Sequence, residues 1–355
     1  MCKKKTILLT TVHPAPYVDR WINVLKQKYN LTIAYHEKKS KMKSWKTFHG
    51  YEGFCFSDFN IVAYLSLLKN YDFVIFGGWY NLYTLIGIFY LWILNRKFAV
   101  FSDYPDDKSL KRKIYYIKKY MLFKLIPYFF CATESCIKFY SENYSIPQNR
   151  LKLFQYIYAK SNWEKVKLIN KQRQRQISEG SRINLFIANN FYYRKGYDVL
   201  VNAFQMLHEQ NSLNRFSITI AGHGVDFEKI KNEILSFDPT VNFVGWIEPD
   251  KYDELMESCD IFIHASFFEP FGIPPLDAMD KGKLLIVSDG VRSVDKLIIN
   301  GVNGFSYKAN DSCALYEILN SINVETIYKI GEAGRNSLLS TYNAETCICS
   351  IEESI

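Results

Sequence analysis

The sequence predicts an α/β protein with two parallel-sheet domains. Short apolar runs typical of buried strands alternate with stretches of helical spacing along most of the 355 residues, and this alternation is characteristic of βα units. The length exceeds what one compact core usually holds and fits two domains of ordinary size. Apolar residues make up 48% of the chain, which is enough for both domains to bury a core.

The first half is expected to form one parallel sheet. A loop at 13–17 and a helix at about 18–29 follow the first strand. Residues 82–94 are mostly apolar but too few to cross a bilayer, which takes about 20 residues. We therefore expect a buried or interfacial helix there. The expected strands cover residues 6–11, 31–35, 73–76, 98–101 and 128–132.

The second half shows the same alternation. Residues 160–180 are polar and rich in Lys and Gln, which suits an interdomain linker. Strands are expected at 183–188, 218–221, 241–244, 261–265 and 284–287. The expected divisions are an N-terminal domain at 1–165, a second domain at 175–340 and a final segment at 341–355.

Eight cysteines are scattered along the chain without the paired spacing of a zinc site. The chain opens with MCKKKTILLT, in which strand residues follow at once, so we expect no signal peptide. Unpaired cysteines and the lack of a signal peptide both suit a reduced cytoplasmic compartment.

Charge is distributed unevenly between the two halves. Residues 1–174 hold 29 Lys and Arg against 11 Asp and Glu, whereas residues 175–355 hold 15 against 25. Two basic runs, 38–46 and 108–124, are interleaved with aromatic residues such as Trp45 and Tyr116. This mixture is typical of an element that binds an anionic membrane surface. A nucleic-acid surface and an ordinary solvated helix face remain alternatives.

The most informative segment is residues 241–304. An apolar strand at 261–265 leads into a Gly/Pro turn that starts at Glu269 and enters a stretch of helical spacing containing Asp277. Two carboxylates therefore flank a strand-to-helix junction, and open α/β sheets bind ligands at such junctions, beside the carboxyl ends of strands. Amides at a helix start attract anions, and carboxylates accept hydrogen bonds from sugar hydroxyls.

This segment resembles the C-terminal half of retaining glycosyltransferases of family 4, the group 1 type. Those enzymes have the GT-B fold, in which two Rossmann-like domains face each other. Their signature is two Glu residues separated by seven positions, with Phe-Gly between and Ala-Met after. The matching residues are Glu269, Phe271, Gly272, Asp277, Ala278 and Met279. Asp277 is one methylene shorter than the family's second Glu, and Arg292-Ser293 replaces a later Gly-Gly.

A second loop agrees with this motif. After the strand at 183–188, Arg194 and Lys195-Gly196 precede an apolar helix. In the family this loop carries an Arg and a Lys that hold the donor's pyrophosphate, and fixed positive charge of this kind stabilises a departing nucleoside diphosphate. The family's Gly-Arg at the strand end is absent here, so we expect Arg194 to supply the missing charge.

The resemblance implies a role for each motif residue. Glu269 is expected near the hydroxyls of the transferred sugar, and with Arg194 and Lys195 it forms the expected catalytic set. Asp277 is expected to bind the ribose diol. The other residues expected at the donor are Phe271, Gly272 and Ile273, through their amides, and Gly222, Trp246 and Ile247, beside the nucleotide.

The acceptor side is expected in the first half, at His13, Tyr17 and Asp103. No metal is implied by the resemblance, because basic side chains and helix amides supply the positive charge. No cofactor is implied either, since the nucleotide sugar is a substrate. The final segment at 341–355 looks like the terminal helix that returns to the first domain in GT-B enzymes.

We therefore expect a hexosyltransferase that moves a sugar, with retention of configuration, from a UDP- or GDP-linked donor to a saccharide acceptor. A lipid-linked acceptor in cell-surface polysaccharide synthesis would suit the basic first half. The protein is expected in the cytoplasm, peripheral at the inner face of the membrane, with no nucleic-acid partner. Two alternatives remain: another GT-B enzyme such as a sugar-nucleotide epimerase, and a basic nucleic-acid-binding protein.

Overall fold

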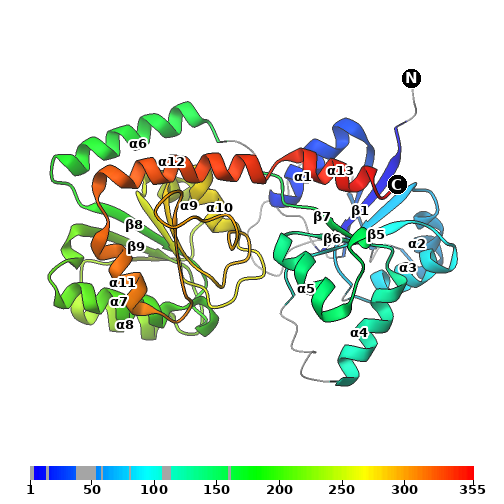
Figure 1. Ribbon diagram of the computed structural model, residues 1–355, viewed down its shortest axis with the longest axis horizontal. Coiled ribbons are helices and arrows are strands. Elements are labelled where there is room, and N and C mark those ends of the chain that lie inside the picture. The colour runs from blue at the N-terminus through cyan, green and yellow to red at the C-terminus, as the bar shows by residue number, and fades with distance from the viewer. Residues whose placement is uncertain are drawn as a thin grey trace. The chain divides into compact units, whose positions relative to one another are not determined.

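The computed structural model describes residues 4–12, 16–36, 53–56, 59–79, 81–105, 113–158 and 161–355. The chain forms two compact units, Met1–Ala159 with Tyr342–Ile355, and Lys160–Thr341. Each unit is a parallel sheet flanked by helices (Figure 1), so the expected α/β class is confirmed. The basic run at 38–46 and His13 lie outside the described residues.

The first unit contains a seven-stranded sheet in the order β3-β2-β1-β4-β5-β6-β7. The strands are β1 (Thr6–Thr11), β2 (Asn30–Tyr35), β3 (Gly53–Cys55), β4 (Phe73–Phe76), β5 (Phe98–Ser102), β6 (Tyr128–Cys131) and β7 (Leu151–Leu153). The helices are α1 (Pro16–Lys28), α2 (Ile61–Leu68), α3 (Leu82–Ile93), α4 (Lys113–Leu125), α5 (Glu134–Tyr144), the 3-10 turn η3 (Gln148–Arg150) and α13 (Ala344–Glu352). The edge strands β3 and β7 were not predicted, because three residues carry too little periodicity to indicate a strand.

The central strands of this sheet are apolar and buried. All four residues of β4 and all five of β5 are buried, which is typical of parallel strands covered on both faces. On one face, α3 packs Thr84, Gly87, Ile88 and Leu91 inward, so the helix expected at 82–94 is confirmed. No helix in the described part of the chain is both long enough and apolar enough to cross a membrane.

The chain returns to the first unit at its end. Asn343 caps α13 by accepting a hydrogen bond from the Thr346 amide at 3.2 Å. Cys347 Sγ then donates to the Gln155 carbonyl at 2.9 Å, and Ser350 Oγ donates to the carbonyl that ends β7 at 2.6 Å. These contacts attach α13 beside β7.

The second unit contains a six-stranded sheet in the order β10-β9-β8-β11-β12-β13. The strands are β8 (Ile183–Ala188), β9 (Phe216–Ala221), β10 (Asn242–Gly245), β11 (Ile261–His264), β12 (Leu284–Ser288) and β13 (Phe305–Tyr307). The helices are α6 (Trp163–Ser178), α7 (Tyr197–Glu209), α8 (Phe227–Phe237), α9 (Pro249–Ser258), α10 (Ile273–Asp280), α11 (Ser312–Ser321) and α12 (Val324–Thr341), with 3-10 turns η4 (Tyr193–Lys195) and η5 (Leu213–Arg215).

The strand order of this sheet reverses between β8 and β11. Along the chain, β8, β9 and β10 proceed toward one edge of the sheet, whereas β11, β12 and β13 proceed toward the other. The loops that leave the carboxyl ends of β8 and β11 therefore diverge and open a crevice between them. Such a switch point is where open α/β sheets bind ligands.

The expected linker at 160–180 is wrong, because most of it forms α6. Its Lys, Gln and Arg residues are good helix formers, and Val166, Asn170 and Ile177 supply a narrow buried face. Arg173 anchors the helix through a hydrogen bond from Nη2 to Oδ2 of Asp260 at 2.8 Å.

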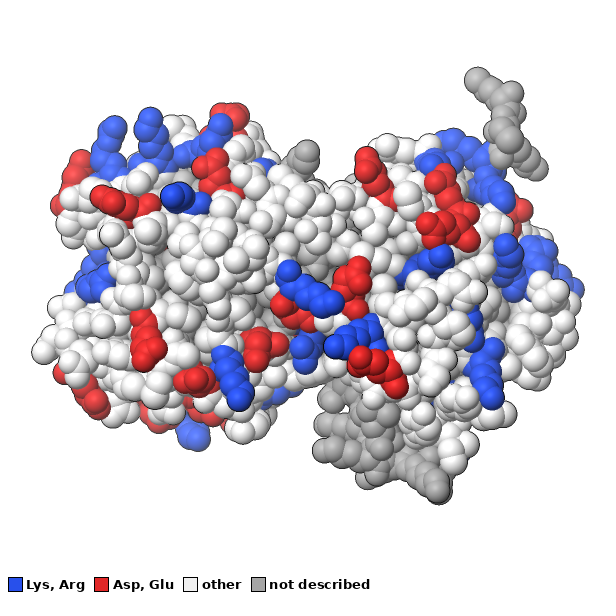
Figure 2. All heavy atoms as spheres, in the orientation of Figure 1, with Lys and Arg blue, Asp and Glu red and all other residues white. Residues whose placement is uncertain are grey.

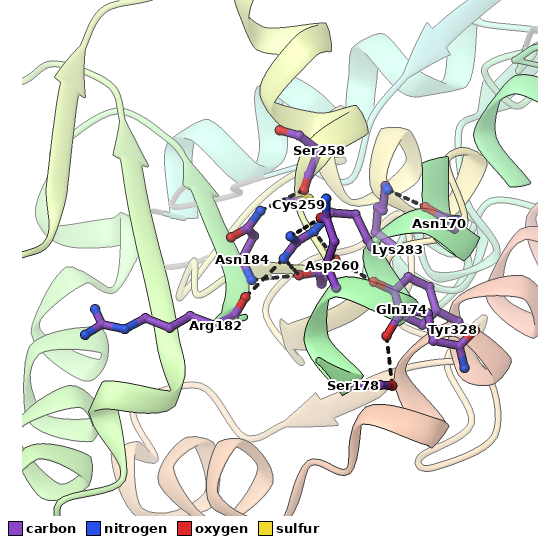
Figure 3. A network of polar contacts seen from close by, with 12 residues as sticks. Asn170, Gln174, Ser178, Arg182, Asn184, Ser258, Cys259, Asp260, Lys283 and Tyr328 are labelled. Atoms are coloured by element: carbon purple, nitrogen blue, oxygen red, sulfur yellow. Dashed lines mark hydrogen bonds and ion pairs between the residues drawn. The ribbon is translucent and has the colours of Figure 1, made fainter. Parts of the chain in front are cut away.

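Asp260 joins several elements at the amino edge of the second sheet (Figure 3). It is fully buried and directly precedes β11. Its oxygens accept hydrogen bonds from the Asn184 amide at 2.7 Å and from the Tyr328 hydroxyl at 2.6 Å. Together with Arg173, these contacts tie α6 and α12 to the sheet at the edge opposite the switch-point crevice.

Candidate functional site

Glu269 lies in the loop between β11 and α10, and two backbone hydrogen bonds join it to the loop after β12. Its amide donates to the Gly290 carbonyl at 3.0 Å, and the Arg292 amide donates to the Glu269 carbonyl at 3.2 Å. Glu269 also forms an isolated parallel bridge with Val291. The backbone of Glu269 is therefore fixed by the loop after β12 as well as by its own loop.

The contacts of the Glu269 carboxylate converge on one oxygen, Oε2. Lys195 Nζ donates a hydrogen bond to it. Ser266 Oγ lies 3.5 Å from the same oxygen, and Arg194 Nη1 and His264 Nε2 each lie 3.8 Å from it. Within the described residues Oε1 takes none of these contacts, which leaves it available to accept from a bound molecule.

The Lys195–Glu269 pair is largely buried. The exposed fraction is 6% for the Lys195 side chain and 16% for that of Glu269. Burial opposes ionisation of Glu269, but the polar contact with His264 and the charge of Lys195 outweigh it and lower the pKa of Glu269 to about 2. Burial lowers the pKa of Lys195, and Glu269 opposes that shift. Burial also lowers the pKa of His264.

A tight turn places Lys195 at the carboxylate. Lys195 ends the 3-10 turn η4, and Gly196 follows with φ +69°. A Cβ on Gly196 would lie 2.1 Å from the Ala265 carbonyl oxygen, so only glycine allows the β8 loop to approach the end of β11 this closely. The Phe267 amide donates to the Arg194 carbonyl at 2.8 Å and joins the same two loops.

Arg194 lies beside the pair but faces outward. Its side chain is 51% exposed, and its Nη1 donates to the Phe268 carbonyl at 3.1 Å. The remaining guanidinium donors can therefore reach a ligand in the crevice, since the fork carries five N–H groups.

The turn between Glu269 and α10 is built around Gly272. Its φ of +96° belongs to the region that glycine adopts most readily, and a Cβ there would lie 2.9 Å from Val291 Cγ1. Ser293 holds the turn from outside, because its Oγ donates to the Gly272 carbonyl at 2.8 Å and its amide donates to the Phe271 carbonyl at 2.9 Å. Ser293 belongs to the Arg292-Ser293 pair that replaces the family's Gly-Gly, and here it stabilises the turn through these two hydrogen bonds. The side chain of Phe271 is buried, so only its backbone can serve a ligand.

Asp277 lies in the second turn of α10. Its Oδ2 accepts a hydrogen bond at 3.0 Å from the hydroxyl of Tyr252 on α9. The side chain is half-buried, and the hydrogen bond fixes its direction. Sequence reasoning missed Tyr252, although its place in the apolar stripe of the helix before β11 could have drawn attention to it.

The residues expected beside the nucleotide lie at the carboxyl ends of β9 and β10. The Gly222 amide donates to the Gly245 carbonyl at 2.7 Å. A Cβ on Gly222, where φ is +139°, would lie 1.8 Å from the Asn189 carbonyl oxygen, so this glycine is sterically required. Trp246 and Ile247 follow β10, with the Trp246 side chain 50% exposed. All the strands of this sheet are parallel, so these residues share the edge at which Glu269 lies.

The first unit contributes one described residue of the expected acceptor side. Asp103 follows β5, and its Oδ1 accepts a hydrogen bond from the Tyr156 hydroxyl at 3.1 Å. The Tyr156 ring stacks on Trp21 with centroids 4.8 Å apart. His13 and the side chain of Tyr17 lie outside the described part of the chain.

Three further polar residues of the cluster were not predicted. Asn189 Nδ2 donates to Ser266 Oγ at 3.1 Å, and Ser266 Oγ lies 3.3 Å from His264 Nε2. His264 is almost fully buried, and among the described residues its Nδ1 has no hydrogen-bond partner. A histidine that ends an apolar strand just before the Glu269 loop was the available signal. No group of three or more His, Cys, Asp or Glu suited to a metal occurs among the described residues.

A family model agrees with this geometry. Residues 169–328 match the model described as glycosyl transferases group 1. This match spans most of the second unit. The matched region runs from α6 into α12 and contains Asn189, Arg194, Lys195, His264, Ser266, Glu269 and Asp277. The suspected family resemblance is thereby confirmed at the level of group 1 glycosyltransferases.

Relatives of known or assigned class are distant. Mannosylfructose-phosphate synthase of Agrobacterium fabrum is 23% identical over 53% of this chain and 44% of its own length. The uncharacterized glycosyltransferase MJ1607 of Methanocaldococcus jannaschii is 25% identical over 56% of this chain and 51% of its own. The chain spans about half the length of these curated relatives.

Solved glycosyltransferase structures share the whole fold. Anabaena Alr3699/HepE in complex with UDP superimposes with a TM-score of 0.76 at 15% identity, covering 98% of both chains. TarM superimposes with a TM-score of 0.74 at 9% identity, again covering 98% of both chains. At these identities the likeness establishes the GT-B fold alone.

Proposed function

We propose that the protein is a retaining, metal-independent glycosyltransferase that moves a hexose from a nucleotide-sugar donor to a saccharide acceptor. The observation that carries this proposal is the contact between Lys195 Nζ and Glu269 Oε2 at the switch point of the second sheet. Oε1 of Glu269 can accept a hydrogen bond from a sugar hydroxyl, and Lys195 and Arg194 can bind a diphosphate. The cluster therefore suits a molecule that contains both groups.

The cluster supplies the charge that sugar transfer requires. As the glycosidic bond to the nucleotide breaks, negative charge grows on the diphosphate, and preorganised cations stabilise that charge without reorganising. Lys195 and the exposed guanidinium of Arg194 are the candidates for this role. Glu269 Oε1 is the candidate acceptor for a sugar hydroxyl, while Oε2 keeps Lys195 in position.

The donor is proposed to be UDP- or GDP-linked. UDP receives support from three structures of Anabaena Alr3699/HepE, solved with UDP, with UDP and glucose, and with UDP-glucose. In the proposed complex Asp277 binds the ribose diol, and the backbone around Gly222 and Gly245 lies against the base with Trp246 and Ile247. The amides at the start of α10 lie beside the sugar.

The acceptor is proposed to be a lipid-linked saccharide used in cell-surface polysaccharide synthesis. The basic first half supports an anionic membrane partner and a peripheral place at the inner membrane face. Asp103, His13 and Tyr17 are the proposed acceptor-side residues. A second candidate, another GT-B enzyme such as an epimerase, would alter the donor without transferring its sugar.

A thermal-shift screen of nucleotide sugars tests this function, because a ligand that binds only the folded state raises Tm by mass action. We expect one nucleotide sugar to raise Tm and its free sugar to leave Tm unchanged. Proton NMR of the product should then show the anomeric configuration of the donor retained. A screen in which no nucleotide sugar raises Tm, or a product with inverted configuration, contradicts the proposal.

A further inference from the structure

Helix α3 is apolar on the side that faces away from its core. It contains no charged residue, and its inner face is buried against the first sheet. The outward side chains keep high exposed fractions: 65% for Leu82, 53% for Phe89, 48% for Trp92 and 58% for Ile93. A surface helix normally carries polar residues on its outer face, and a helix apolar all round is typical of a buried or membrane-contacting element.

The helices on either side of α3 extend this apolar surface. α3 contacts both α2 and α4, and each exposes two large apolar side chains: Ile61 and Val62 on α2, Ile117 and Met121 on α4. We call this surface, with Leu82, Leu85, Phe89, Trp92, Ile93 and Leu94, the α3 face. Apart from Val12, every exposed large apolar residue among the described residues of the first unit lies on it. Concentration on one surface marks an interaction site.

The α3 face is bordered by bases. The sequences of α2, α3 and α4 contain no Asp or Glu. Exposed cations lie on these helices or just after them: Lys69 after α2, Arg96 and Lys97 after α3, and Lys118 and Lys124 on α4. In Figure 2, the right-hand edge of the first unit, where Figure 1 labels α2 and α3, is mostly white, and the charged atoms around it are mainly blue.

A basic cavity opens at the end of this surface. It has a volume of about 310 Å³ and is lined by Trp92, Arg96, Lys124 and Arg150, together with apolar residues and Asn95. None of its lining residues is acidic. An indole beside three cations is the chemistry of the lipid head-group region, where phosphates meet the first carbons of the acyl chains.

We propose that the α3 face docks the protein on the surface of an anionic bilayer. Phe89, Trp92 and Met121 enter the boundary between head groups and acyl chains, and the surrounding Lys and Arg contact lipid phosphates. The contact lies in the plane of the surface, as expected of an amphipathic interfacial element. The purpose of this docking rests on the proposed lipid-linked acceptor. The exposed apolar side chains and the charges that support docking do not depend on that acceptor.

Charge favours a bilayer over a second copy of the chain. A symmetric dimer through the α3 face would bring the Lys and Arg of one copy against those of the other, with no acid on the three helices to offset them. An anionic bilayer offers opposite charge at the rim and hydrocarbon at the centre. The basic run 108–124 therefore contributes through α4, while Tyr116, one of the aromatic residues within that run, points inward. Its hydroxyl donates to the Asn143 carbonyl at 3.0 Å, and its ring stacks on Tyr144.

Vesicle co-sedimentation of the full chain tests the docking. The test variant combines Phe89→Gln, Trp92→Gln and Met121→Gln, which remove exposed apolar area and keep good helix formers. The control combines Leu168→Gln, Val225→Gln and Val302→Gln, at exposed apolar positions of the second unit. We expect the wild type and the control to sediment with phosphatidylcholine vesicles that contain phosphatidylglycerol, and less so as salt rises. The test variant should lose affinity by about tenfold or more.

Two outcomes would overturn the docking proposal: a test variant that binds like the control, or a wild type that binds vesicles of pure phosphatidylcholine equally well. A dimer in light scattering that the test variant abolishes, without vesicle binding by the wild type, would assign the face to self-association instead. Thermal shifts with nucleotide sugars keep the two proposals separate, since the test variant should keep the wild-type shift. Vesicle binding without any nucleotide-sugar shift would leave the docking standing and refute the proposed function.

Discussion

Lys195 donates its hydrogen bond to Oε2 of Glu269 across 74 positions of sequence and joins the loops that leave β8 and β11. The strand order reverses between these two strands, so the pair lies where the sheet opens a crevice. Both charges are held before any substrate arrives, and the burial of Lys195 strengthens its field.

Replacing either base should slow transfer without removing the site. We expect Lys195→Ala and Arg194→Ala each to reduce kcat by about 10²–10³, the cost typical of losing one preorganised donor at a developing anion. Lys229→Ala, at an exposed position of α8, is the matched control and should keep the wild-type rate. Steady-state kinetics at saturating donor measures the effect. Near wild-type rates in both variants would remove these residues from the active site.

Glu269 should make stability depend on pH in acid. Its folded pKa of about 2 is depressed below the ordinary value of 4.5. The ionised carboxylate therefore stabilises the fold above pH 4.5, and this contribution is lost as pH falls toward 2, amounting to at most about 3 kcal/mol. Urea unfolding of Glu269→Gln should show a flatter profile in this window than the wild type. Glu332→Gln, at an exposed position, should keep the wild-type profile; a Glu269→Gln profile as steep as the wild type would show that Glu269 is not the group responsible.

Activity should persist in excess EDTA. The charge of the leaving diphosphate is assigned to Lys195 and Arg194, so chelation should leave the initial rate unchanged. The measurement compares rates before and after dialysis against chelator. Complete loss of activity that returns with Mg²⁺ or Mn²⁺ would contradict this assignment.

The Asp260 network should support stability and not catalysis. Asp260→Asn leaves Arg173, which is 14% exposed, without its buried carboxylate, and breaking such a pair typically costs about 3–5 kcal/mol. Urea denaturation should show this loss, while the rate per folded molecule stays at the wild-type value because Asp260 lies at the amino edge of the sheet. Asp250→Asn, exposed on α9, should change neither quantity. A large fall in kcat at full folding would place the network in the catalytic machinery.

The sequence singled out residues that the fold brings together, but it did not show how they meet. Lys195, Arg194 and Glu269 were found from local motifs, but their meeting depends on strand order, which no local pattern reports. Tyr252 was missed because a tyrosine within an apolar helical stripe looks like core. α6 was mistaken for a linker because its buried face has only three residues, too narrow to give a clear period. The helix at 82–94 was predicted, yet which of its apolar side chains face outward became known only from its packing on the sheet.

The central claim is that the Lys195–Glu269 pair belongs to a nucleotide-sugar site. Calorimetric titration of the wild type and of Lys195→Ala with UDP-glucose and GDP-mannose tests it most directly. We predict that the wild type binds one of these donors and that Lys195→Ala weakens this binding by at least about tenfold, the loss of one charge-assisted hydrogen bond. Equal affinity in the two proteins, or binding of neither donor by the wild type, would contradict the claim.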